Sequence, residues 1–392
     1  MDLTLIVVLV IALALFFDFT NGFHDTANAM ATPIATGALR PKVAVGLAAI
    51  LNLVGAFLST EVAKTISGGI INEGDGGVLI TPELIFAGLI GAIVWNMVTW
   101  LLGLPSSSSH ALFGGLIGAA LVGFGLQSID FSVVMSKVIL PAILAPLTAG
   151  LIAYTATKLA YAITRRYDGK PDGRDGFRHA QIFSSSLVAL AHGTNDAQKT
   201  MGVITLTLVA AGLQSSGDEV QLWVIVSCAV AIALGTYMGG WRIIKTLGTG
   251  LTDVKPAQGF AAETSTAATI LASTHLGFAL STTQVASGSV IGSGLGRRGS
   301  KVRWRTAGRI GIGWLMTLPA AGAVGALAAL VAQLGVIGVL IDAVVGVIVI
   351  AVIFLWSRRN EVSHTNVVSE VAASGRAVKI KRNPKPKKKV AP

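Results

Sequence analysis

The sequence is poor in charge and almost lacks cysteine. Only 12% of its 392 residues are Asp, Glu, Lys or Arg, whereas a soluble domain carries about 25%. Cys228 is the single cysteine, so a disulfide framework within the chain is excluded and we expect this side chain to serve packing. The sequence has no G-x-x-x-x-G-K-[ST] loop, which argues against a pump driven by nucleotide hydrolysis.

Long apolar segments take the place of the missing charge. The mean hydropathy is +0.71, and apolar runs approach about 20 residues, the length of a membrane-spanning helix. They lie near 3–20, 43–59, 83–103, 133–163, 180–213, 220–240, 258–278, 306–333 and 336–356. The first run follows Met1-Asp2 without Lys or Arg, so we interpret it as a span rather than a cleaved signal peptide. The sequence predicts an all-α, polytopic integral membrane protein.

The net charge of +11 is unevenly distributed. Lys and Arg cluster at 40–42, 165–178, 297–309 and 358–389, and such clusters mark the cytoplasmic side of a membrane. We therefore expect residues 357–392 to form a basic cytoplasmic tail, solvated or in contact with anionic membrane lipid. We expect no nucleic-acid partner for a tail attached to a membrane bundle.

Two pairs of segments match each other at nearly the same spacing. Residues 22–30 and 193–201 share Gly, Asp and Met at equivalent positions, and residues 107–118 and 281–292 share hydroxyl side chains followed by two glycines. The first matched segment runs toward the basic residues 40–42, whereas its partner starts from a basic loop. The matched segments therefore cross in opposite directions, which predicts two inverted-topology repeats with a site between them near the bilayer midplane.

This scheme divides the chain into five parts. A weaker third match joins 64–66 to 245–247, and residues 83–124 and 258–296 are each predicted to form a hairpin with a polar corner. The predicted parts are a first repeat (1–163), a cytoplasmic loop (164–179), a second repeat (180–305), C-terminal transmembrane helices (306–356) and the tail (357–392).

Polar segments interrupt two apolar runs, at 21–28 and 192–199. A charged residue at membrane depth costs about 2.5–3.5 kcal/mol on insertion scales, so it persists where it faces a cavity or a partner. Because Gly and Asn loosen a helix, we predict discontinuous helices at both segments. Asp25 and Asp196 are candidates for a shared site, with an ion pair to Lys199 or Lys64 as the structural alternative.

The polar hairpin corners combine hydroxyl groups with helix N-termini, at 106–110 and 281–284. Together these groups can cradle an oxyanion without a strong positive charge. Two aspartates would repel such an anion, so they are better suited to a coupling cation, Na⁺ or H⁺. Helix capping is the structural alternative for the serines. Hydrogen-bonded packing is the alternative to a proton relay for His24, His110, His192 and His275.

These motifs, at 22–28, 193–202 and the two corners, resemble the paired signature of the inorganic phosphate transporter (PiT) family, in its bacterial form, over roughly 3–356. The resemblance implies a symporter, not an enzyme, that takes up inorganic phosphate with Na⁺ or H⁺ by alternating access. In some bacterial members the substrate is a metal–phosphate complex. It further implies a plasma-membrane (bacterial inner-membrane) location and no cofactor other than the coupling ion; a homodimer is expected by analogy alone.

Site residues follow from the resemblance by position. The implied phosphate ligands are Asp25, Asn28, Ser107, Ser108, Ser109, Asp196, Ser281, Thr282 and Thr283. The implied ligands of the coupling cation are Asp25, Asn28, Asn195, Asp196 and Glu263. Asp25 and Asp196 are the implied ligands of a metal. Lys64 departs from the family pattern, because relatives in higher organisms have a glutamate there.

Three other functions fit parts of the pattern. A permease for sulfate or another oxyanion could use the same scaffold. An intramembrane aspartyl protease would pair Asp25 with Asp196, but it leaves the hydroxyl corners without a role. A passive channel is the third alternative.

Overall fold

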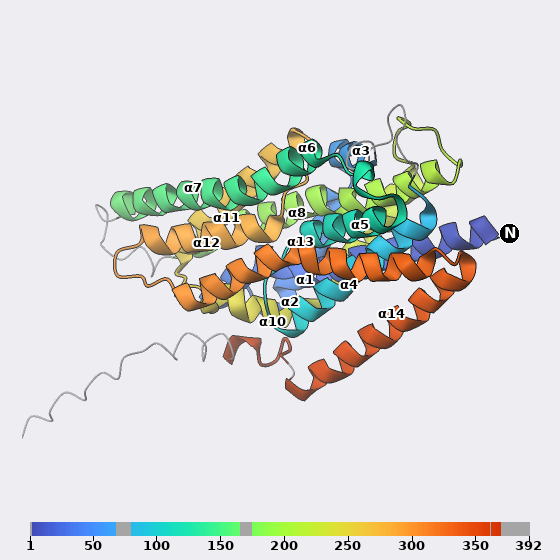
Figure 1. Ribbon diagram of the computed structural model, residues 1–392. Helices are drawn as coiled ribbons and strands as arrows, with labels where there is room; N and C mark the ends of the chain where they lie inside the picture. Colours follow the sequence, from blue (N-terminus) through green and yellow to red (C-terminus); the bar gives the residue numbers. More distant parts are fainter. Residues whose placement is uncertain (1, 68–79, 165–174, 361, 370–392) are drawn as a thin grey trace, which may run out of the picture.

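The computed structural model describes residues 2–67, 80–164, 175–360 and 362–369. These residues form a bundle of helices, most of which run along one axis (Figure 1). The helices are α1 (Asp2–Thr36), α2 (Pro41–Gly55), α3 (Glu61–Ser67), α4 (Pro82–Leu101), α5 (Ser108–Phe124), α6 (Phe131–Val133), α7 (Leu140–Thr164), α8 (Asp175–Ala210), α9 (Leu222–Met238), α10 (Trp241–Lys245), α11 (Pro256–His275), α12 (Thr282–Gly296), α13 (Trp304–Ala332) and α14 (Val336–Ser357).

The all-α membrane bundle predicted from the sequence is confirmed, since each apolar run falls on a helix. Within the described residues, five helices are long and apolar enough to cross a membrane, and a bent pair over Leu222–Met238 and Trp241–Gly250 makes a sixth candidate. Short π-helical segments at Val134–Ile139 and Thr246–Gly250 lie before α7 and after α10.

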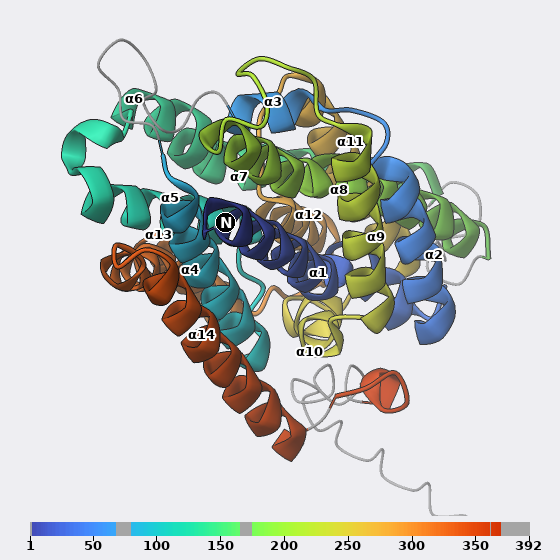
Figure 2. The same cartoon turned by 90° about the vertical axis from the view of Figure 1, so that its right-hand side faces the viewer.

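Helix α1 occupies the middle of the bundle. Figure 2 shows it nearly end-on between α4, α8, α9 and α12, with α14 at the outer edge. Its residues 24–34 are all buried. A polar side chain in this stretch therefore faces protein rather than lipid, which is the condition for keeping it at membrane depth.

The predicted breaks at 21–28 and 192–199 are wrong, because α1 and α8 run as continuous α-helices through both segments. The glycines serve close helix contacts instead. A Cβ on Gly22 would lie 2.2 Å from the Ile232 carbonyl oxygen, and one on Gly193 would lie 2.2 Å from that of Asn52. Small residues allow this approach between backbones. Discontinuity occurs elsewhere, at Gly239 (φ 72°), where the chain bends by 58° between α9 and α10.

Helices α4 and α5 form the first hairpin, and α11 and α12 form the second. The first corner lies inside the bundle, because the Trp314 indole Nε1 donates to the Pro105 carbonyl oxygen over 3.0 Å. Trp314 stands ten residues into α13, about 15 Å from that helix's start at 1.5 Å per residue. The corner is thus held beside α13 and does not reach the end of that helix.

Both halves use the same close contacts around these hairpins. Helix α5 packs on α13 through glycines, and α12 packs on α7 through the equivalent glycines. The distances from the added Cβ to the facing carbonyl oxygen are 2.5 Å for Gly114–Leu318, 2.0 Å for Gly118–Gly322, 2.4 Å for Gly288–Pro146 and 1.9 Å for Gly292–Gly150. Each hairpin therefore rests on a helix from the other half of the chain.

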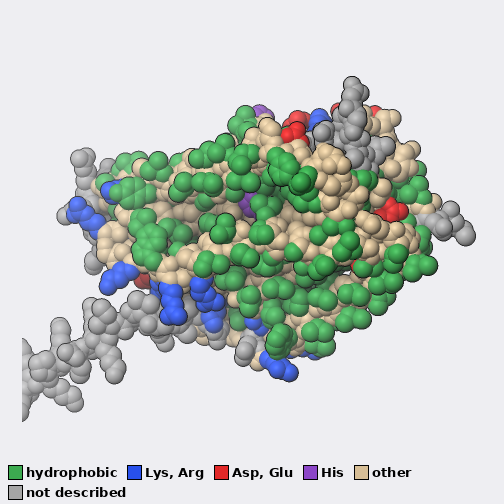
Figure 3. Space-filling model, viewed as in Figure 1, with side chains coloured by type: hydrophobic (Ala, Val, Ile, Leu, Met, Phe, Trp, Pro, Cys, Tyr) green, Lys and Arg blue, Asp and Glu red, His purple; other side chains and the backbone are tan. Residues whose placement is uncertain are grey.

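The surface divides by charge. In Figure 3, Lys and Arg gather at the end where α7 ends and α13 begins, while Asp and Glu lie toward the opposite end, with a mainly apolar surface between them. The loop predicted over 164–179 lies mostly outside the described residues, and α8 already begins at Asp175. Residues 370–392 of the predicted tail lie outside the described residues as well.

Candidate functional site

The two predicted aspartates meet where α1 crosses α8. Asp25 and Asp196 are 2% and 1% exposed. The Thr282 hydroxyl, in the first turn of α12, lies 3.4 Å from Asp25 Oδ2 and 3.0 Å from Asp196 Oδ2. A hydroxyl has one proton to donate, so it satisfies only one of these carboxylates at a time. The N-terminus of α12 thus points at two buried acids.

Basic side chains surround the same carboxylates. His192 Nε2 lies 3.0 Å from Asp196 Oδ2 and 4.0 Å from Asp25 Oδ2. Lys199 forms an ion pair with Asp196 and also donates to the Leu280 carbonyl oxygen over 3.0 Å. On the other side, His24 Nδ1 lies 2.5 Å from Asp25 Oδ1. The ion pair predicted as the structural alternative is therefore present between Asp196 and Lys199.

Lys64 lies outside this site. It is about half exposed and pairs with Glu61 on α3 at 3.1 Å. The alternative ion pair between a buried aspartate and Lys64 is thus not formed in the structure. A glutamate at position 64 would likewise stand at the surface on α3, away from the crossing of α1 and α8.

The donor set around Asp25 and Asp196 can hold a cation. One ligand atom each from Asp25, His192 and Asp196 lie within 4.8 Å of one another. Carboxylate oxygens suit Na⁺ and hard divalent ions, whereas an imidazole nitrogen adds affinity for a transition metal. The Lys199 ammonium already neutralises one carboxylate, so it competes with an added cation for Asp196.

The two hairpin corners begin their helices in the same way. Ser107 Oγ accepts from the His110 amide over 3.1 Å, and Ser281 Oγ accepts from the Gln284 amide over 3.3 Å. Both are N-caps, as the structural alternative for the serines predicted. In contrast, the buried Ser108 Oγ has no hydrogen-bond partner among the described residues. Ser108 is therefore the serine of this corner that remains available to a ligand.

Ser109 and Asn28 join the corners to α1. Ser109 Oγ donates to the Leu280 carbonyl oxygen over 3.1 Å, which links the first corner to the second. Asn28 Nδ2 donates to Thr282 Oγ1 and Thr283 Oγ1 over 3.3 and 3.0 Å. The structure thus brings Asp25, Asn28, Asp196, Thr282 and Thr283 into one cluster. Ser109 is connected to this cluster through the Leu280 carbonyl oxygen, to which Lys199 also donates.

The two remaining predicted residues lie apart from that cluster. Asn195 donates to Thr274 Oγ1 over 2.8 Å, and its Oδ1 is buried without a partner in the described part of the chain. Glu263 accepts from Thr32, from Gln181 over 3.0 Å and from Ser184 over 2.6 Å. Thr32 lies seven residues after Asp25 on α1, about 10 Å along the axis. Glu263 therefore belongs to a second polar cluster nearer the basic end of the bundle.

The sequence had already indicated Lys199, as an ion-pair partner, and His192, as a hydrogen-bonded or relay histidine, but it did not indicate Asp18. Lys199 and His192 both contact the Asp196 carboxylate directly. Asp18 is fully buried, and neither of its carboxylate oxygens has a hydrogen-bond partner among the described residues. It precedes Asp25 by two helical turns, so the helical spacing of acids within an apolar run could have revealed it.

Comparisons with known proteins point to one family. The model of the phosphate transporter family matches residues 21–325. A probable low-affinity inorganic phosphate transporter of Mycobacterium tuberculosis is 57% identical over 373 residues, covering 94% of this chain and 88% of that protein. One of the same description from Bacillus subtilis is 42% identical and covers 83% and 96%. The solved structure "The sodium-dependent phosphate transporter" has the same fold, with a TM-score of 0.74, 24% identity and coverage of 84% and 99%.

Proposed function

The chain belongs to the phosphate transporter family, and we propose that it takes up inorganic phosphate together with a coupling cation, Na⁺ or H⁺. Its relatives are transporters and not enzymes. The observation that carries the proposal is the Thr282 hydroxyl between the carboxylates of Asp25 and Asp196. It places an anion-binding helix N-terminus beside two acids that suit a cation.

The charge of the cluster supports coupled binding. With neutral histidines, Asp25, Asp196 and Lys199 together carry one net negative charge in a fully buried region. Phosphate adds one or two more negative charges, and burying charge without compensation is strongly unfavourable. A cation that enters with phosphate removes this penalty, so neither ion binds well alone. This is the physical basis of symport at the site.

The hydroxyl corners supply the phosphate cradle in this proposal. Ser108, Thr282 and Thr283 stand in the first turns of α5 and α12, where amide N–H groups also face outward from the helix. These donors are neutral, so they bind an oxyanion less tightly than arginine side chains would and release it faster. Ser107 and Ser281 act indirectly, by capping the helices that carry the cradle.

The cation sites follow from the acids and from acceptors that lack donors. Asn28 Oδ1 and Asn195 Oδ1 are buried without partners among the described residues, and amide oxygens are ligands for hard cations. We place one cation at Asp25 and Asn28 and assign Glu263, ringed by neutral donors, to a second cation or proton. The name of the solved relative supports Na⁺. A metal–phosphate substrate would instead use Asp25, His192 and Asp196.

The paired helix contacts support alternating access between inverted repeats. We place the repeats at α1–α7 and α8–α13, because α13 and α7 receive α5 and α12 through equivalent glycines. Each hairpin corner is covered by a short helix of the other half. Thr246, after α10, donates to the Gly103 carbonyl oxygen over 2.7 Å, and Thr65 on α3 lies against Gly277. These two short helices are the proposed gates.

Uptake of ³²P-phosphate into proteoliposomes tests the proposal. An inward Na⁺ gradient and an inward proton gradient are imposed separately, with excess unlabelled sulfate in a third arm. We expect phosphate to accumulate under one of the two gradients and sulfate not to compete. Phosphate entry without dependence on either gradient would indicate a passive channel, and full competition by sulfate would indicate a general oxyanion permease.

A further inference from the structure

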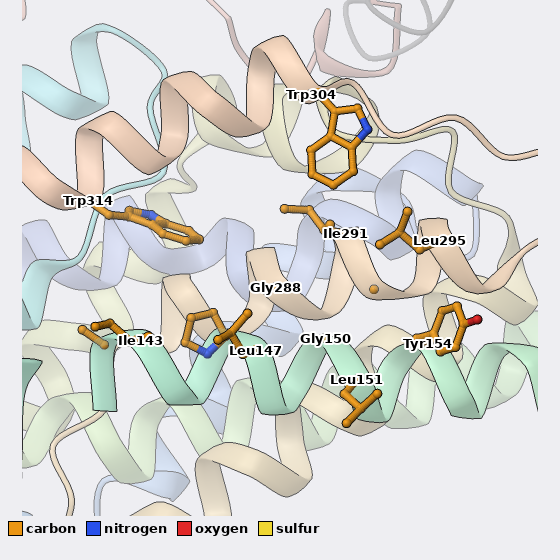
Figure 4. A pocket seen from close by; sticks show the side chains of 13 residues that line it. Ile143, Leu147, Gly150, Leu151, Tyr154, Gly288, Ile291, Leu295, Trp304 and Trp314 are labelled. Carbon is orange, nitrogen blue, oxygen red and sulfur yellow. The ribbon is translucent and has the colours of Figure 1, made fainter. Parts of the chain in front are cut away.

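An apolar groove runs along the lipid-facing side of the bundle between α7, α12 and α13. Its volume is about 650 Å³, and its walls include Leu147, Leu151, Ile291 and Leu295. Figure 4 shows Trp314 and Ile143 at one end of the groove and Trp304, Leu295 and Tyr154 at the other. None of these residues belongs to the polar cluster on α1 and α8, so the groove is a separate feature.

The dimensions of the groove match one leaflet of a bilayer. Its wall on α13 runs from Trp304 to Trp314, which is about 15 Å at 1.5 Å per residue. Half of the roughly 30 Å hydrocarbon core of a membrane has the same depth. Trp304 and Tyr154 stand at the outer end, where amphipathic aromatic rings are typical of the membrane–water interface.

The interfacial end of the groove is strongly basic. The Lys158 ammonium lies 4.4 Å from the centre of the Tyr154 ring, so it is held at the groove's edge. Arg298 and Arg305 are exposed, and in the sequence they stand three residues after Leu295 and directly after Trp304, which line the opposite wall. The sequences of α7, α12, α13 and the segment 297–303 contain no Asp or Glu. A negative head group therefore meets cations without competing acids.

From these features we propose that the groove holds one acyl chain of an anionic phospholipid from the basic, cytoplasmic leaflet, with its phosphate head group bound by Lys158, Arg298 and Arg305. The apolar walls take the chain, the aromatic rings mark the glycerol level, and the basic rim selects the negative charge. Exposed basic residues outside such a groove attract the membrane surface but cannot retain a single lipid.

The bound chain lies against both substrate hairpins. Trp314, at the inner end of the groove, donates to the Pro105 carbonyl oxygen in the first corner. Gly288 and Gly292, in the groove wall, belong to α12, whose first turn carries Thr282. The lipid is therefore placed to stabilise the α4–α5 and α11–α12 hairpins from the membrane side.

Native mass spectrometry of the full chain in detergent tests the site. The protein is delipidated and titrated with palmitoyl-oleoyl phosphatidylglycerol, or with phosphatidylcholine of the same chains. We expect one phosphatidylglycerol per chain, bound more tightly than phosphatidylcholine. Each basic residue near anionic lipid contributes about 1 kcal/mol, so the pair Lys158→Ala and Arg305→Ala should weaken phosphatidylglycerol binding about thirtyfold.

Two further variants decide whether the groove itself is occupied. Leu147→Trp fills the groove and should weaken binding of both lipids. Arg40→Ala with Lys42→Ala removes two cations from the start of α2, away from the groove, and should leave both affinities unchanged. The proposal would be overturned if the Arg40→Ala and Lys42→Ala variant lost as much phosphatidylglycerol affinity as the Lys158→Ala and Arg305→Ala variant. It would also be overturned if lipid affinity were unchanged both in Leu147→Trp and in the Lys158→Ala and Arg305→Ala variant. A dimer mass that Leu147→Trp abolishes would overturn it as well, since a second copy would then occupy the groove.

Discussion

At the scale of single residues, Ser107 and Ser108 are neighbours with different tasks. Ser107 Oγ is engaged as the N-cap of α5, whereas Ser108 Oγ has no partner within the described chain. A buried hydroxyl without a partner costs free energy that a ligand can recover. The structure therefore separates a residue that caps the helix at this corner from one whose hydroxyl is available to a ligand.

We expect Ser108→Ala to raise the KM for phosphate about tenfold or more, because a hydrogen bond to a charged group contributes about 1.5–3 kcal/mol. Its thermal stability should stay near that of the wild type. Ser107→Ala should instead lower stability by about 1 kcal/mol through the lost cap. Uptake kinetics and melting of the purified protein measure the two effects. An unchanged KM in Ser108→Ala would remove this hydroxyl from the cradle.

The ion pair of Lys199 with Asp196 leads to a second prediction. Both side chains are buried, so Lys199→Met leaves the Asp196 carboxylate without its compensating charge, a change that costs about 3–5 kcal/mol in buried pairs. We expect a marked loss of folded protein in detergent.

The double variant Lys199→Met with Asp196→Asn removes both charges and should recover most of that loss, although not transport. Fluorescence-detected size-exclusion chromatography after heating compares the three proteins. Equal stability of Lys199→Met and wild type would show that Lys199 does not compensate Asp196.

At the scale of helices, glycines decide how closely α1 and α8 approach their neighbours. In Gly22→Ala the new methyl group would collide with the backbone of α9, which cannot move as a side chain can. Overpacking of this kind costs about 1–3 kcal/mol. We expect a lower melting temperature, whereas Gly46→Ala should be neutral because nothing lies within 4 Å of its added Cβ. Equal melting of Gly22→Ala and wild type would contradict the packing role.

The same glycines show where sequence reasoning succeeded and where it failed. The alignment of the two halves predicted that Gly114 and Gly118 correspond to Gly288 and Gly292, and these glycines make matching contacts. The inference that Gly22 and Gly193 unwind their helices was wrong. A glycine is compatible with both a break and a close contact, and only the position of the facing helix separates the two.

The polar cluster shows a similar limit. Asp25, Asp196 and the hydroxyl corner of Thr282 were predicted together because the duplicated motifs repeat them, and Asn28 was added by the family resemblance. The sequence named Lys199 and Lys64 as alternative ion-pair partners, and the structure distinguishes them, because Lys199 pairs with Asp196 whereas Lys64 pairs with Glu61. Glu263 was expected beside the cluster, but the crossing of α1 and α11 carries it to Thr32, Gln181 and Ser184 instead.

At the scale of the whole molecule, helices of each half of the chain pack against helices of the other half. Each hairpin packs on a helix of the opposite half, and each corner is covered by a short helix of that half. In the proposed mechanism the site therefore lies between two bodies that can rock about it. Both bodies contribute ligands to the cation and to phosphate. We therefore propose that the transporter reorients when both ions are bound or when the site is empty.

The central claim is that phosphate and its cation bind together at Asp25 and Asp196. It is tested most directly by ³²P-phosphate affinity of the purified protein, with Na⁺ replaced by choline at constant ionic strength and at several pH values. Linkage requires that the coupling cation tighten phosphate binding. We predict such tightening, by Na⁺ or by protons, in wild type and in the surface control Asp253→Asn but not in Asp25→Asn. A phosphate affinity that responds to Na⁺ and pH equally in wild type and Asp25→Asn would contradict the account.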